Sequence, residues 1–403
     1  MDNNTILGII AEYNPLHNGH LYHIQEAMRQ SSANALIIAL SSHFVQRGEP
    51  SFIDKWSRAE AALKAGADLV IEIPSAFSCQ NAGIFASSGV DVLWKTGLVT
   101  HISFGMEDPQ IDLRKLAEIL LEEPQPFKVA LRKKLNEGFS FVESMAEAFE
   151  KTLPGSYHAV RNPNNILALN YMKHILEKKY PLVVLPIQRK GEHCHSRKTT
   201  PLASASAIRA SLYRGEKHIL KMLPNFSSDI ISRELEKGRC FNTYEHYWRI
   251  LRAVIVRTSP KELLDFSDIS EGAENLIYQA ARQARSFEGM VQICTSKRYP
   301  KSRIQRQLAH VLLGFKREEY MKTQKNGVPY LRVLGMNEKG KALLRKMRHT
   351  ATLPVVFRPR HFEDDYSKFV ADFEHTSSEL WETCIPKQGN LKEKDCPPVI
   401  LPE

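Results

Sequence analysis

Two histidines three residues apart, His17 and His20, enclose a glycine shortly after an apolar run that is typical of a buried strand. An imidazole N–H can donate to a phosphate oxygen, and well-placed donors stabilise the charge that grows on the non-bridging oxygens during displacement at phosphorus. Gly19 has no Cβ, so the backbone or a ligand can approach closely. The spacing therefore predicts a phosphate-binding corner with His17 and His20 as catalytic donors.

The secondary structure expected around this corner supports the same chemistry. Residues 5–11 predict a strand, a turn containing Pro15 follows, and a helix is expected from about Gly19 to Gln30. Ligands of open α/β sheets bind where strands end and helices begin, and a helix N-terminus offers free N–H groups to a phosphate. Two nearby histidines are often merely structural, but their spacing after a strand and a proline turn favours function.

Strand and helix patterns alternate over the segment that must position this corner. Strands are expected at 35–40, 68–73 and 101–104 and a central strand at 181–187, and helices at 54–64, 80–94, between 111 and 149, at 164–178 and 206–213. This alternation predicts right-handed βαβ units and a parallel sheet. The expected fold class is therefore α/β, with a Rossmann-like catalytic domain.

Helical patterns dominate after about residue 216. They lie at 229–237, 244–256, 272–286, 302–314 and 337–347, and the last thirty-odd residues look irregular. We therefore expect a catalytic domain at 1–220, a mainly helical basic domain at 221–360 and an acidic, partly irregular tail at 361–403.

Positive charge is concentrated in one block of the chain. Residues 291–360 contain 17 Lys and Arg against 3 Asp and Glu, whereas the net charge of the whole chain is +10. Such concentration favours a polyanionic partner, most simply nucleic acid, over an ordinary solvated face. Cations neutralise phosphates, and a tyrosine can stack on an unpaired base. The candidate RNA-binding residues are Lys297, Arg298, Tyr299, Lys301, Arg303, Arg306 and Arg332, and Lys339, Lys341, Arg345, Lys346 and Arg348 extend the positive charge.

Other features of the sequence bear on compartment and metals. No apolar run approaches the roughly 20 residues that cross a bilayer, and the N-terminus lacks the pattern of a signal peptide. Six scattered cysteines without a CxxC pair suit reduced thiols, so we expect a cytoplasmic protein. The sequence His193-Cys194-His195 is a weak candidate for a metal site because adjacent side chains rarely converge on one ion. No protein-bound metal is expected.

Several segments together resemble the bacterial tRNA(Met) cytidine acetate ligase family, within the HxGH nucleotidyltransferase superfamily. The resemblance covers nearly the whole chain. It is carried by AEYNPLHNGHLYH at 11–23, VQRGEPSFIDKWSRAEAAL at 45–63, ISFGMED at 102–108, NPNNILALNY at 162–171, LASASAIRASL at 202–212, KRYPKSRIQR at 297–306 and YLRVLGMNEKGKALL at 330–344. The segment 191–196 departs from the family pattern, which puts any inherited role for that segment in doubt.

The resemblance implies that ATP activates acetate as acetyl-adenylate and that the acetyl group then passes to the wobble cytidine of elongator tRNA(Met). Magnesium would be carried by ATP. The implied ATP-binding residues are Ile10, Ala11, Glu12, Tyr13, Asn14, Pro15, Leu16, His17, Asn18, Gly19, His20, Leu21, Tyr22, His23, Gly105, Asn164, Asn165, Arg189, Ser204, Ser206 and Arg209. Only one of Asn164 and Asn165 need contact ATP, with a slight preference for Asn165, and the serines could simply cap a helix.

Two other functions stay open. A small-molecule adenylyl- or cytidylyltransferase would explain the histidines but leave the basic block unused, and a non-catalytic RNA-binding protein would leave the histidines unused. Arg47, Lys55 and Arg58 could each reach a phosphate, although ordinary surface charge explains them equally well. The sequence suggests no protein partner and no membrane.

Overall fold

The computed structural model describes residues 5–189, 203–387 and 393–402. Its centre is a mixed sheet with the strand order β5-β4-β1-β2-β3-β6-β7, and β8 pairs with β6 beside this path. The strands are β1 (Ile6–Ala11), β2 (Ala35–Ser41), β3 (Leu69–Ile73), β4 (His101–Met106), β5 (Val183–Gln188), β6 (Leu331–Met336), β7 (Val355–Val356) and β8 (Val399–Ile400). The α/β class expected from the sequence is confirmed.

The first five strands are parallel, as predicted, but β6 runs antiparallel to β3. The strand expected at the centre from 181–187 is instead the edge strand β5, with Val183 about half exposed (52%). Only one face of β5 packs against the rest of the protein, because alternate side chains of a strand point to opposite faces, and this packing accounts for its apolar residues.

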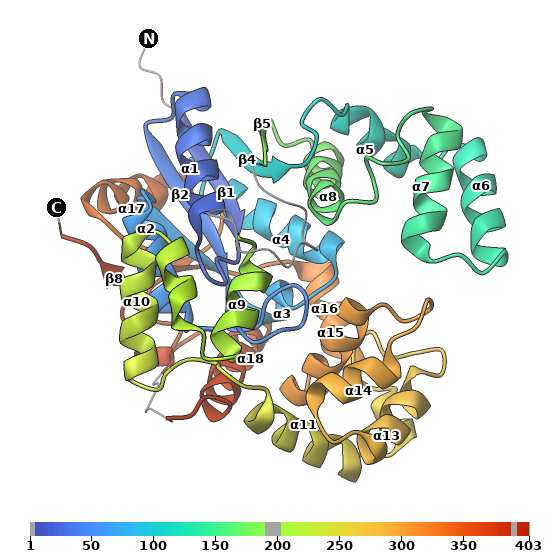
Figure 1. Ribbon diagram of the computed structural model, residues 1–403. Helices are drawn as coiled ribbons and strands as arrows, with labels where there is room; N and C mark the ends of the chain where they lie inside the picture. The colour runs from blue at the N-terminus through green and yellow to red at the C-terminus, as the bar shows by residue number, and fades with distance from the viewer. Residues whose placement is uncertain (1–4, 190–202, 388–392, 403) are drawn as a thin grey trace.

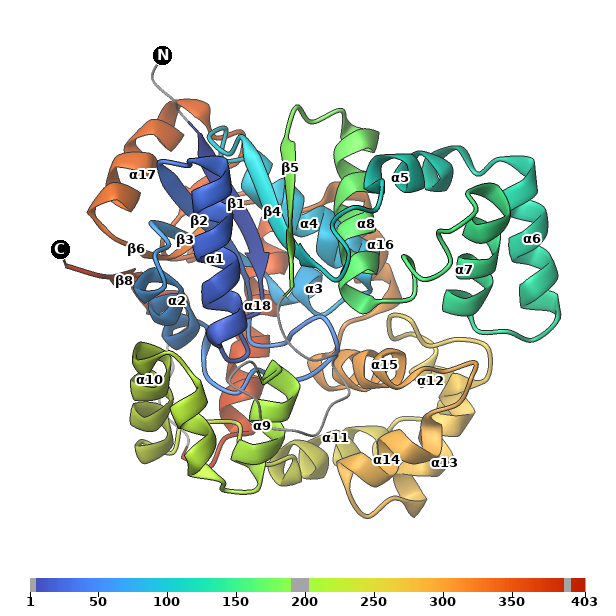
Figure 2. The ribbon, with the colours of Figure 1, turned by 45° about the horizontal axis from the view of Figure 1, so that its top comes forward.

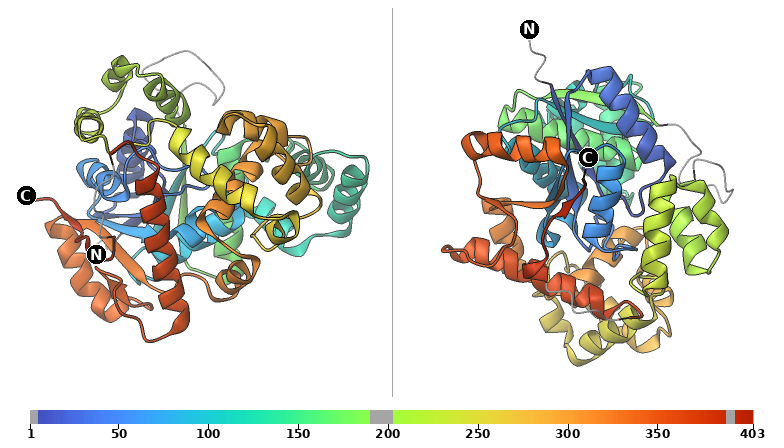
Figure 3. Two further views of the ribbon diagram at one scale, coloured as in Figure 1. Left: turned by 90° about the horizontal axis from the view of Figure 1, so that it is seen from below. Right: turned by 90° about the vertical axis from the view of Figure 1, so that its left-hand side faces the viewer.

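Helices cover both faces of the sheet (Figure 3). Leu7 and Ile9 face one core, together with α1, α2, α9 and α10, whereas Ile6 faces the other core, with α3, α4, α8 and α18. These helices are α1 (Asn18–Ser31), α2 (Lys55–Lys64), α3 (Ser75–Ser78), α4 (Ala82–Trp94), α8 (Pro163–Lys178), α9 (Ala205–Tyr213), α10 (Asn225–Glu236) and α18 (Asp365–Thr383). The sheet is thus buried on both sides, as its apolar strands require.

Two groups of helices extend from this body (Figures 1 and 2). An arm between β4 and α8 comprises α5 (Leu113–Glu122), α6 (Gln125–Asn136) and α7 (Phe141–Thr152). A second group, the helical unit, follows the 3-10 helix η1 (Lys217–Met222) and α10. It comprises α11 (Glu245–Arg257), α12 (Pro260–Leu263), α13 (Ala273–Gln283), α14 (Phe287–Cys294), α15 (Lys301–Leu313) and α16 (Arg317–Asn326).

The chain returns to the sheet after the helical unit, so the expectation of a helical domain up to residue 360 differs from the structure. β6 is fully buried in the sheet, and α17 (Glu338–Thr350) packs against β3 and β6. The last thirty-odd residues are also less irregular than expected. Residues 365–383 form α18, and η2 (Glu393–Asp395) is followed by β8. None of the described helices is long and apolar enough to cross a membrane.

Candidate active site

The two histidines lie at the N-terminus of α1, directly beyond the end of β1, as the sequence predicted. His17 is the N-cap residue, and its Nδ1 accepts from the backbone N–H of Gly19 at 3.0 Å. Nδ1 of His20 accepts in turn from the backbone N–H of His17 at 3.3 Å. The two rings stack with their centroids 3.7 Å apart. This reciprocal capping fixes both imidazoles in one orientation.

The capping also determines which nitrogen of each ring is a donor. Burial lowers the pKa of His17 to about 3, with a further contribution from the positive charge of Arg189, and burial lowers the pKa of His20 well below its ordinary value. Both rings are therefore neutral at physiological pH. Because each Nδ1 accepts a backbone N–H, each ring carries its single proton on Nε2. Neither Nε2–H has a hydrogen-bond partner among the described residues, so both can donate to a ligand.

Gly19 is needed because the ring of His17 occupies the space that a side chain at position 19 would take. A Cβ at this position would lie 2.9 Å from Cε1 of His17, so any side chain would displace the imidazole. The neighbouring Asn18 donates from its side chain to the carbonyl of Met222 at 2.7 Å and so attaches η1 to the start of α1. The third histidine of the segment, His23, lies within hydrogen-bond distance of Ser103 on β4 (2.9 Å).

Arg189 lies at the end of β5, beside this corner. Its positive charge contributes to the lowered pKa values of His17, His20 and His23, so its guanidinium lies near all three rings. A Cβ on Gly105 would lie 3.1 Å from the Arg189 side chain, so the glycine within β4 lets that side chain pack closely against the strand. The arginine is 39% exposed and faces Glu107 at 3.7 Å. Such a cation is well placed to meet a phosphate.

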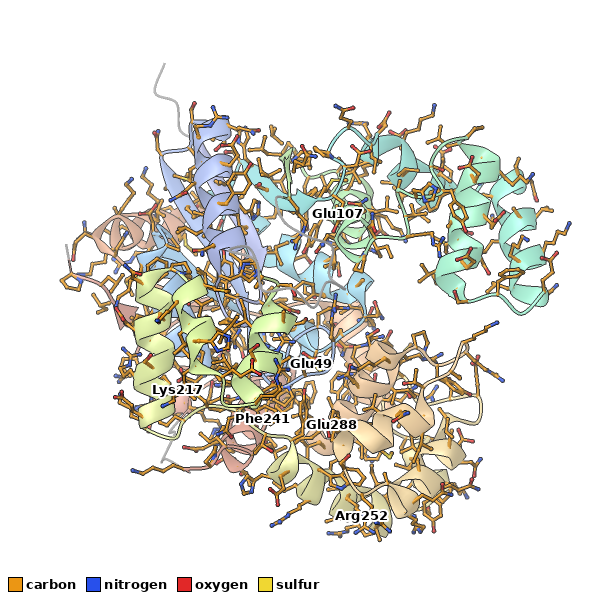
Figure 4. The ribbon with its side chains drawn as sticks, viewed as in Figure 1. Glu49, Glu107, Lys217, Phe241, Arg252 and Glu288 are labelled. Carbon is orange, nitrogen blue, oxygen red and sulfur yellow. The ribbon has the colours of Figure 1, made fainter. Side chains whose placement is uncertain are left out.

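The two asparagines of the NN pair lie at the N-terminus of α8 and both contact Glu107. Asn164 donates to Oε1 of Glu107 at 2.6 Å, and Oδ1 of Asn165 accepts from the Glu107 backbone N–H at 3.2 Å. The buried Nδ2 of Asn165 and Oε2 of Glu107 have no partner among the described residues. A buried polar atom without a partner is costly unless a ligand satisfies it. Figure 4 labels Glu107 beside α8.

The turn between β1 and α1 brings further polar groups to the site. Tyr13 packs edge-on against His20, and its buried hydroxyl has no partner among the described residues. Oδ1 of Asn14 accepts from the backbone N–H of Phe52 at 2.7 Å, whereas its buried Nδ2 has no described partner. Ile10, Ala11, Pro15, Leu16, Leu21 and Tyr22 complete the predicted segment, with Ala11, Pro15 and Leu16 buried.

α9 contributes one contact to this turn. Ser204 is the N-cap residue of α9 and accepts from the backbone N–H of Ala207 at 3.3 Å, whereas Ser206 is exposed. Arg209 donates to the carbonyl of Asn14 at 2.7 Å and forms an ion pair with Glu49, which Figure 4 labels near α9. Arg209 therefore contacts the β1–α1 turn directly, and Ser204 lies at the start of the same helix. The His193-Cys194-His195 segment lies outside the described residues.

Lys55 and Arg58 are structural, contrary to the suggestion that they reach phosphate. Both are fully buried. Arg58 donates to the carbonyls of Glu12 and Ser41 at 2.8 and 2.9 Å, which joins the ends of β1 and β2. Lys55 forms ion pairs with a cluster of buried carboxylates, Glu72, Glu374 and Glu393. A metal ion could occupy such a cluster, but the ammonium of Lys55 and the guanidinium of Arg332 already pair with these carboxylates.

The predicted RNA-binding residues divide into exposed and buried groups. Lys297 and Arg298 are exposed between α14 and α15, Lys301 is exposed at the start of α15, and Arg303 is partly exposed. The prediction that Arg332 binds RNA is wrong, because its side chain is 1% exposed and ion-paired with Glu72 and Glu393 inside the sheet. A buried charge held in this way cannot reach RNA.

Tyr299 and Arg306 are also less available than expected. The ring of Tyr299 is only 7% exposed, and its hydroxyl donates to the carbonyl of Glu271. Arg306 is 8% exposed and faces Asp268 at 3.9 Å. Neither stacking by Tyr299 nor phosphate binding by Arg306 fits this arrangement. Sequence reasoning could not see these partners because they come from the α12–α13 connection.

Three site residues escaped the sequence analysis. Ser103 contacts His23, Glu107 holds the two asparagines, and Glu49 pairs with Arg209. Glu107 had a recognisable signal, because it is an acidic residue directly after a buried strand. Ser103 and Glu49 gave no such signal, because their partners are distant in the sequence.

The low pKa values predict a loss of stability in acid. Burial lowers the pKa of His23 to about 4, whereas an unfolded histidine takes a proton near pH 6.5. Between these two pH values the unfolded chain binds more protons than the folded protein. The free energy of unfolding therefore falls by about 1.4 kcal/mol for each unit by which the pH is lowered, for each such histidine. Urea unfolding between pH 7 and pH 4 should therefore be less pH-dependent for His23→Gln. An equally steep dependence in this variant would contradict the buried, neutral state of His23.

This fold and site define a nucleotidyltransferase with an HxGH corner at the end of its first strand. A model of the HIGH Nucleotidyl Transferase family matches residues 4–395. The tRNA(Met) cytidine acetate ligase of Syntrophomonas wolfei is 37% identical over 362 residues, which are 88% of this chain and 87% of the relative. The ligase of the same name from Acetivibrio thermocellus is 34% identical over 393 residues, 94% of this chain and 95% of the relative. The chain belongs to the tRNA(Met) cytidine acetate ligase family.

Solved structures agree with this assignment. The crystal structure of Thermotoga maritima TmcAL in its apo form superposes with a TM-score of 0.92 at 28% identity, covering 99% of this chain and 100% of that chain. The structure of the same protein bound with alpha-thio ATP gives a TM-score of 0.90 at 29% identity, with the same coverage.

Proposed function

We propose that this protein uses ATP to activate acetate as acetyl-adenylate and then acetylates the wobble cytidine of elongator tRNA(Met). The observation that carries the proposal is the capped pair of neutral imidazoles, His17 and His20, in a chain whose relatives are named tRNA(Met) cytidine acetate ligases. The small-molecule alternative explains the histidines but gives no use to the basic residues beside α15. Because ATP and tRNA are cytoplasmic, we also expect a cytoplasmic location.

In the first step, an acetate oxygen attacks the α-phosphorus of ATP. The bond from the α-phosphorus to the bridging oxygen breaks, and pyrophosphate leaves with that electron pair. The Nε2–H groups of His17 and His20 donate to the non-bridging oxygens, where negative charge grows, and Arg189 adds positive charge beside them. Magnesium held by the triphosphate and by water would shield the phosphates.

The unpartnered atoms beside α8 support an adenosine site. Nδ2 of Asn165 is a buried donor and Oε2 of Glu107 is a buried acceptor, and both lack a described partner. The polar edge of a nucleoside offers complementary acceptors and donors. This arrangement favours Asn165 over Asn164 as the ATP contact, because the Nδ2 group of Asn164 already donates to Glu107. Gly105 borders the same region from β4.

We propose that tRNA binds the exposed basic residues between α14 and α15 rather than those of α17. The α15 side is joined to the active site through the loop at 45–50, because a Cβ on Gly48 would lie 2.4 Å from the backbone nitrogen of Arg306. Arg345 and Arg348 of α17 are exposed on another side of the molecule (Figure 1). RNA would then bind the helical unit while ATP binds the α/β part.

This division predicts different effects of charge removal. Replacing Lys297, Arg298 and Lys301 by glutamine should weaken tRNA binding, and the slope of log K against log salt should decrease by about one for each RNA phosphate that is no longer neutralised. The matched variant Arg345→Gln/Arg348→Gln should bind tRNA as the unchanged protein does. Filter binding between 50 and 200 mM salt would measure both effects. Equal weakening by both variants would contradict the proposed surface.

The proposed function is tested by incubating the protein with labelled acetate, ATP and purified elongator tRNA(Met). Label should enter the tRNA only when ATP is present, and nuclease digestion should recover it in acetylcytidine. Acetate should also stimulate the exchange of labelled pyrophosphate into ATP. A protein that exchanges pyrophosphate but never labels tRNA would favour the small-molecule transferase instead.

A further inference from the structure

The carboxylate of Glu12 differs in chemistry from the phosphate-binding groups of the active site. His17, His20 and Arg189 offer N–H donors to a phosphate, whereas an ionised carboxylate offers acceptors and repels the phosphate charge. Glu107 is also acidic, but its Oε1 accepts from Asn164 and its Oε2 belongs to the proposed adenosine site. Glu12 follows β1 directly and precedes His17 by five residues. A carboxylate at this position is poorly suited to binding phosphate and needs another role.

The structure fixes Glu12 while leaving one of its oxygens open. The backbone N–H of Gln46 donates to Oε1 at 3.0 Å, and Arg58 donates to the Glu12 main-chain carbonyl at 2.8 Å. Oε2 has no partner among the described residues, and it is not one of their buried unpartnered atoms. The side chain is partly buried. The Glu12 carboxylate is therefore positioned by the hydrogen bond to Oε1, while Oε2 can still accept a proton.

Glu12 also lies where the ATP corner meets the proposed RNA side. The loop at 45–50 contacts Glu12 through Gln46, α15 through Gly48 and α9 through Glu49. An RNA bound beside α15 would reach the histidines past this loop. A nucleoside that enters the corner from that side therefore comes next to Glu12.

The transfer step needs a proton acceptor at this place. The exocyclic amine of cytidine is a weak nucleophile because its lone pair is delocalised into the ring, and it must lose a proton as it forms the new bond. A general base within hydrogen-bond reach typically accelerates such a step by about 10²–10⁴-fold. Burial raises the pKa of Glu12 above its ordinary value, with Glu49 adding to the shift and Arg47 and Arg209 opposing it. The carboxylate is thus a stronger base than an exposed glutamate.

Building on the proposed function, we propose that Glu12 is the general base of acetyl transfer to cytidine. The N4 lone pair attacks the carbonyl carbon of acetyl-adenylate, and the bond from that carbon to the phosphate oxygen breaks. AMP leaves with the electron pair of the broken bond. Oε2 of Glu12 takes one of the two N4 protons and later releases it to solvent.

The test separates the two half-reactions in Glu12→Gln, which keeps the acceptor for Gln46. Acetyl transfer to tRNA(Met), measured in a single turnover from preformed acetyl-adenylate, should fall by about 10²–10⁴-fold, whereas acetate-dependent pyrophosphate exchange should fall less than about tenfold. Transfer by the unchanged protein should rise with pH along an ionisation that Glu12→Gln removes. Glu118→Gln, a glutamate of α5 whose side chain is 46% exposed, serves as the matched control.

The outcomes are distinct. Equal losses in both half-reactions would overturn the proposal, because they would assign Glu12 to the structure of the ATP corner. Undiminished transfer in Glu12→Gln would overturn it as well. A lack of pyrophosphate exchange in the unchanged protein would instead contradict the proposed function, and this inference would fall with it.

Discussion

Replacing His17 or His20 by asparagine should slow the formation of acetyl-adenylate by about 10²–10³-fold in each variant, as expected for the loss of one donor to a developing charge. The asparagine oxygen can stand where Nδ1 accepts its backbone N–H, so the start of α1 is kept, but no donor stands at the position of Nε2. The affinity for ATP should change much less than the rate, because charge on the oxygens grows in the transition state. Acetate-dependent pyrophosphate exchange and calorimetric titration of ATP measure the two quantities.

A matched substitution sharpens this prediction. Glutamine at position 17 places its amide N–H near the former Nε2, so His17→Gln should retain more activity than His17→Asn. An exchange rate that neither asparagine substitution changes would contradict the role of the imidazoles. A large loss of ATP affinity with an unchanged rate would show that they bind the ground state instead.

Replacing Lys55 by methionine should lower the free energy of unfolding by about 3–5 kcal/mol, because it leaves Arg332 to compensate three buried carboxylates and removes the cation paired with Glu374. The Lys55 ammonium lies 2.7 Å from Glu374 and 2.8 Å from Glu393 and also pairs with Glu72, and all four side chains are fully buried. The cluster joins α2 and β3 to α18 and η2. Its loss should therefore release the C-terminal segment from the sheet. Urea unfolding measures the effect.

The same helix provides the control for this prediction. Lys64 is 37% exposed and pairs with Glu60 at 2.9 Å, so Lys64→Met should cost at most about 1 kcal/mol. Glu374→Gln should recover part of the loss in Lys55→Met, because it removes one uncompensated charge. Equal destabilisation by Lys55→Met and Lys64→Met would contradict the structural role of the cluster.

Local patterns predicted the elements around the active site well. The apolar run of β1, the glycine of the HxGH motif and the helical pattern at 54–64 each specify a structure through neighbouring residues, and the structure has β1, α1 and α2 where they were expected. Patterns that depend on distant partners were missed. Arg332 interrupts the apolar run of β6, and its charge suggested a surface position, although two glutamates from other elements neutralise it.

One element that the sequence analysis missed, α18, has a local sequence pattern that predicts it. Residues of α18 such as Phe369, Val370, Phe373 and Trp381 recur at helical spacing and pack against the core, so the helix was detectable behind its acidic composition. The junction between the loop at 45–50 and α15 had no local sequence signal, because the residues that meet there are 256 positions apart in the sequence. Contacts of this length are set by tertiary packing. The histidine pair could therefore be predicted, whereas the environment of Glu12 required the structure.

The central claim is that His17 and His20 donate from Nε2 to the oxygens on the α-phosphorus. A crystal structure with an acetyl-sulfamoyl analogue of acetyl-adenylate tests it most directly. Each Nε2 should lie about 3 Å from a sulfamoyl oxygen, within ordinary hydrogen-bond distance. An analogue bound away from the N-terminus of α1, or rings whose Nδ1 atoms face the ligand, would contradict the claim.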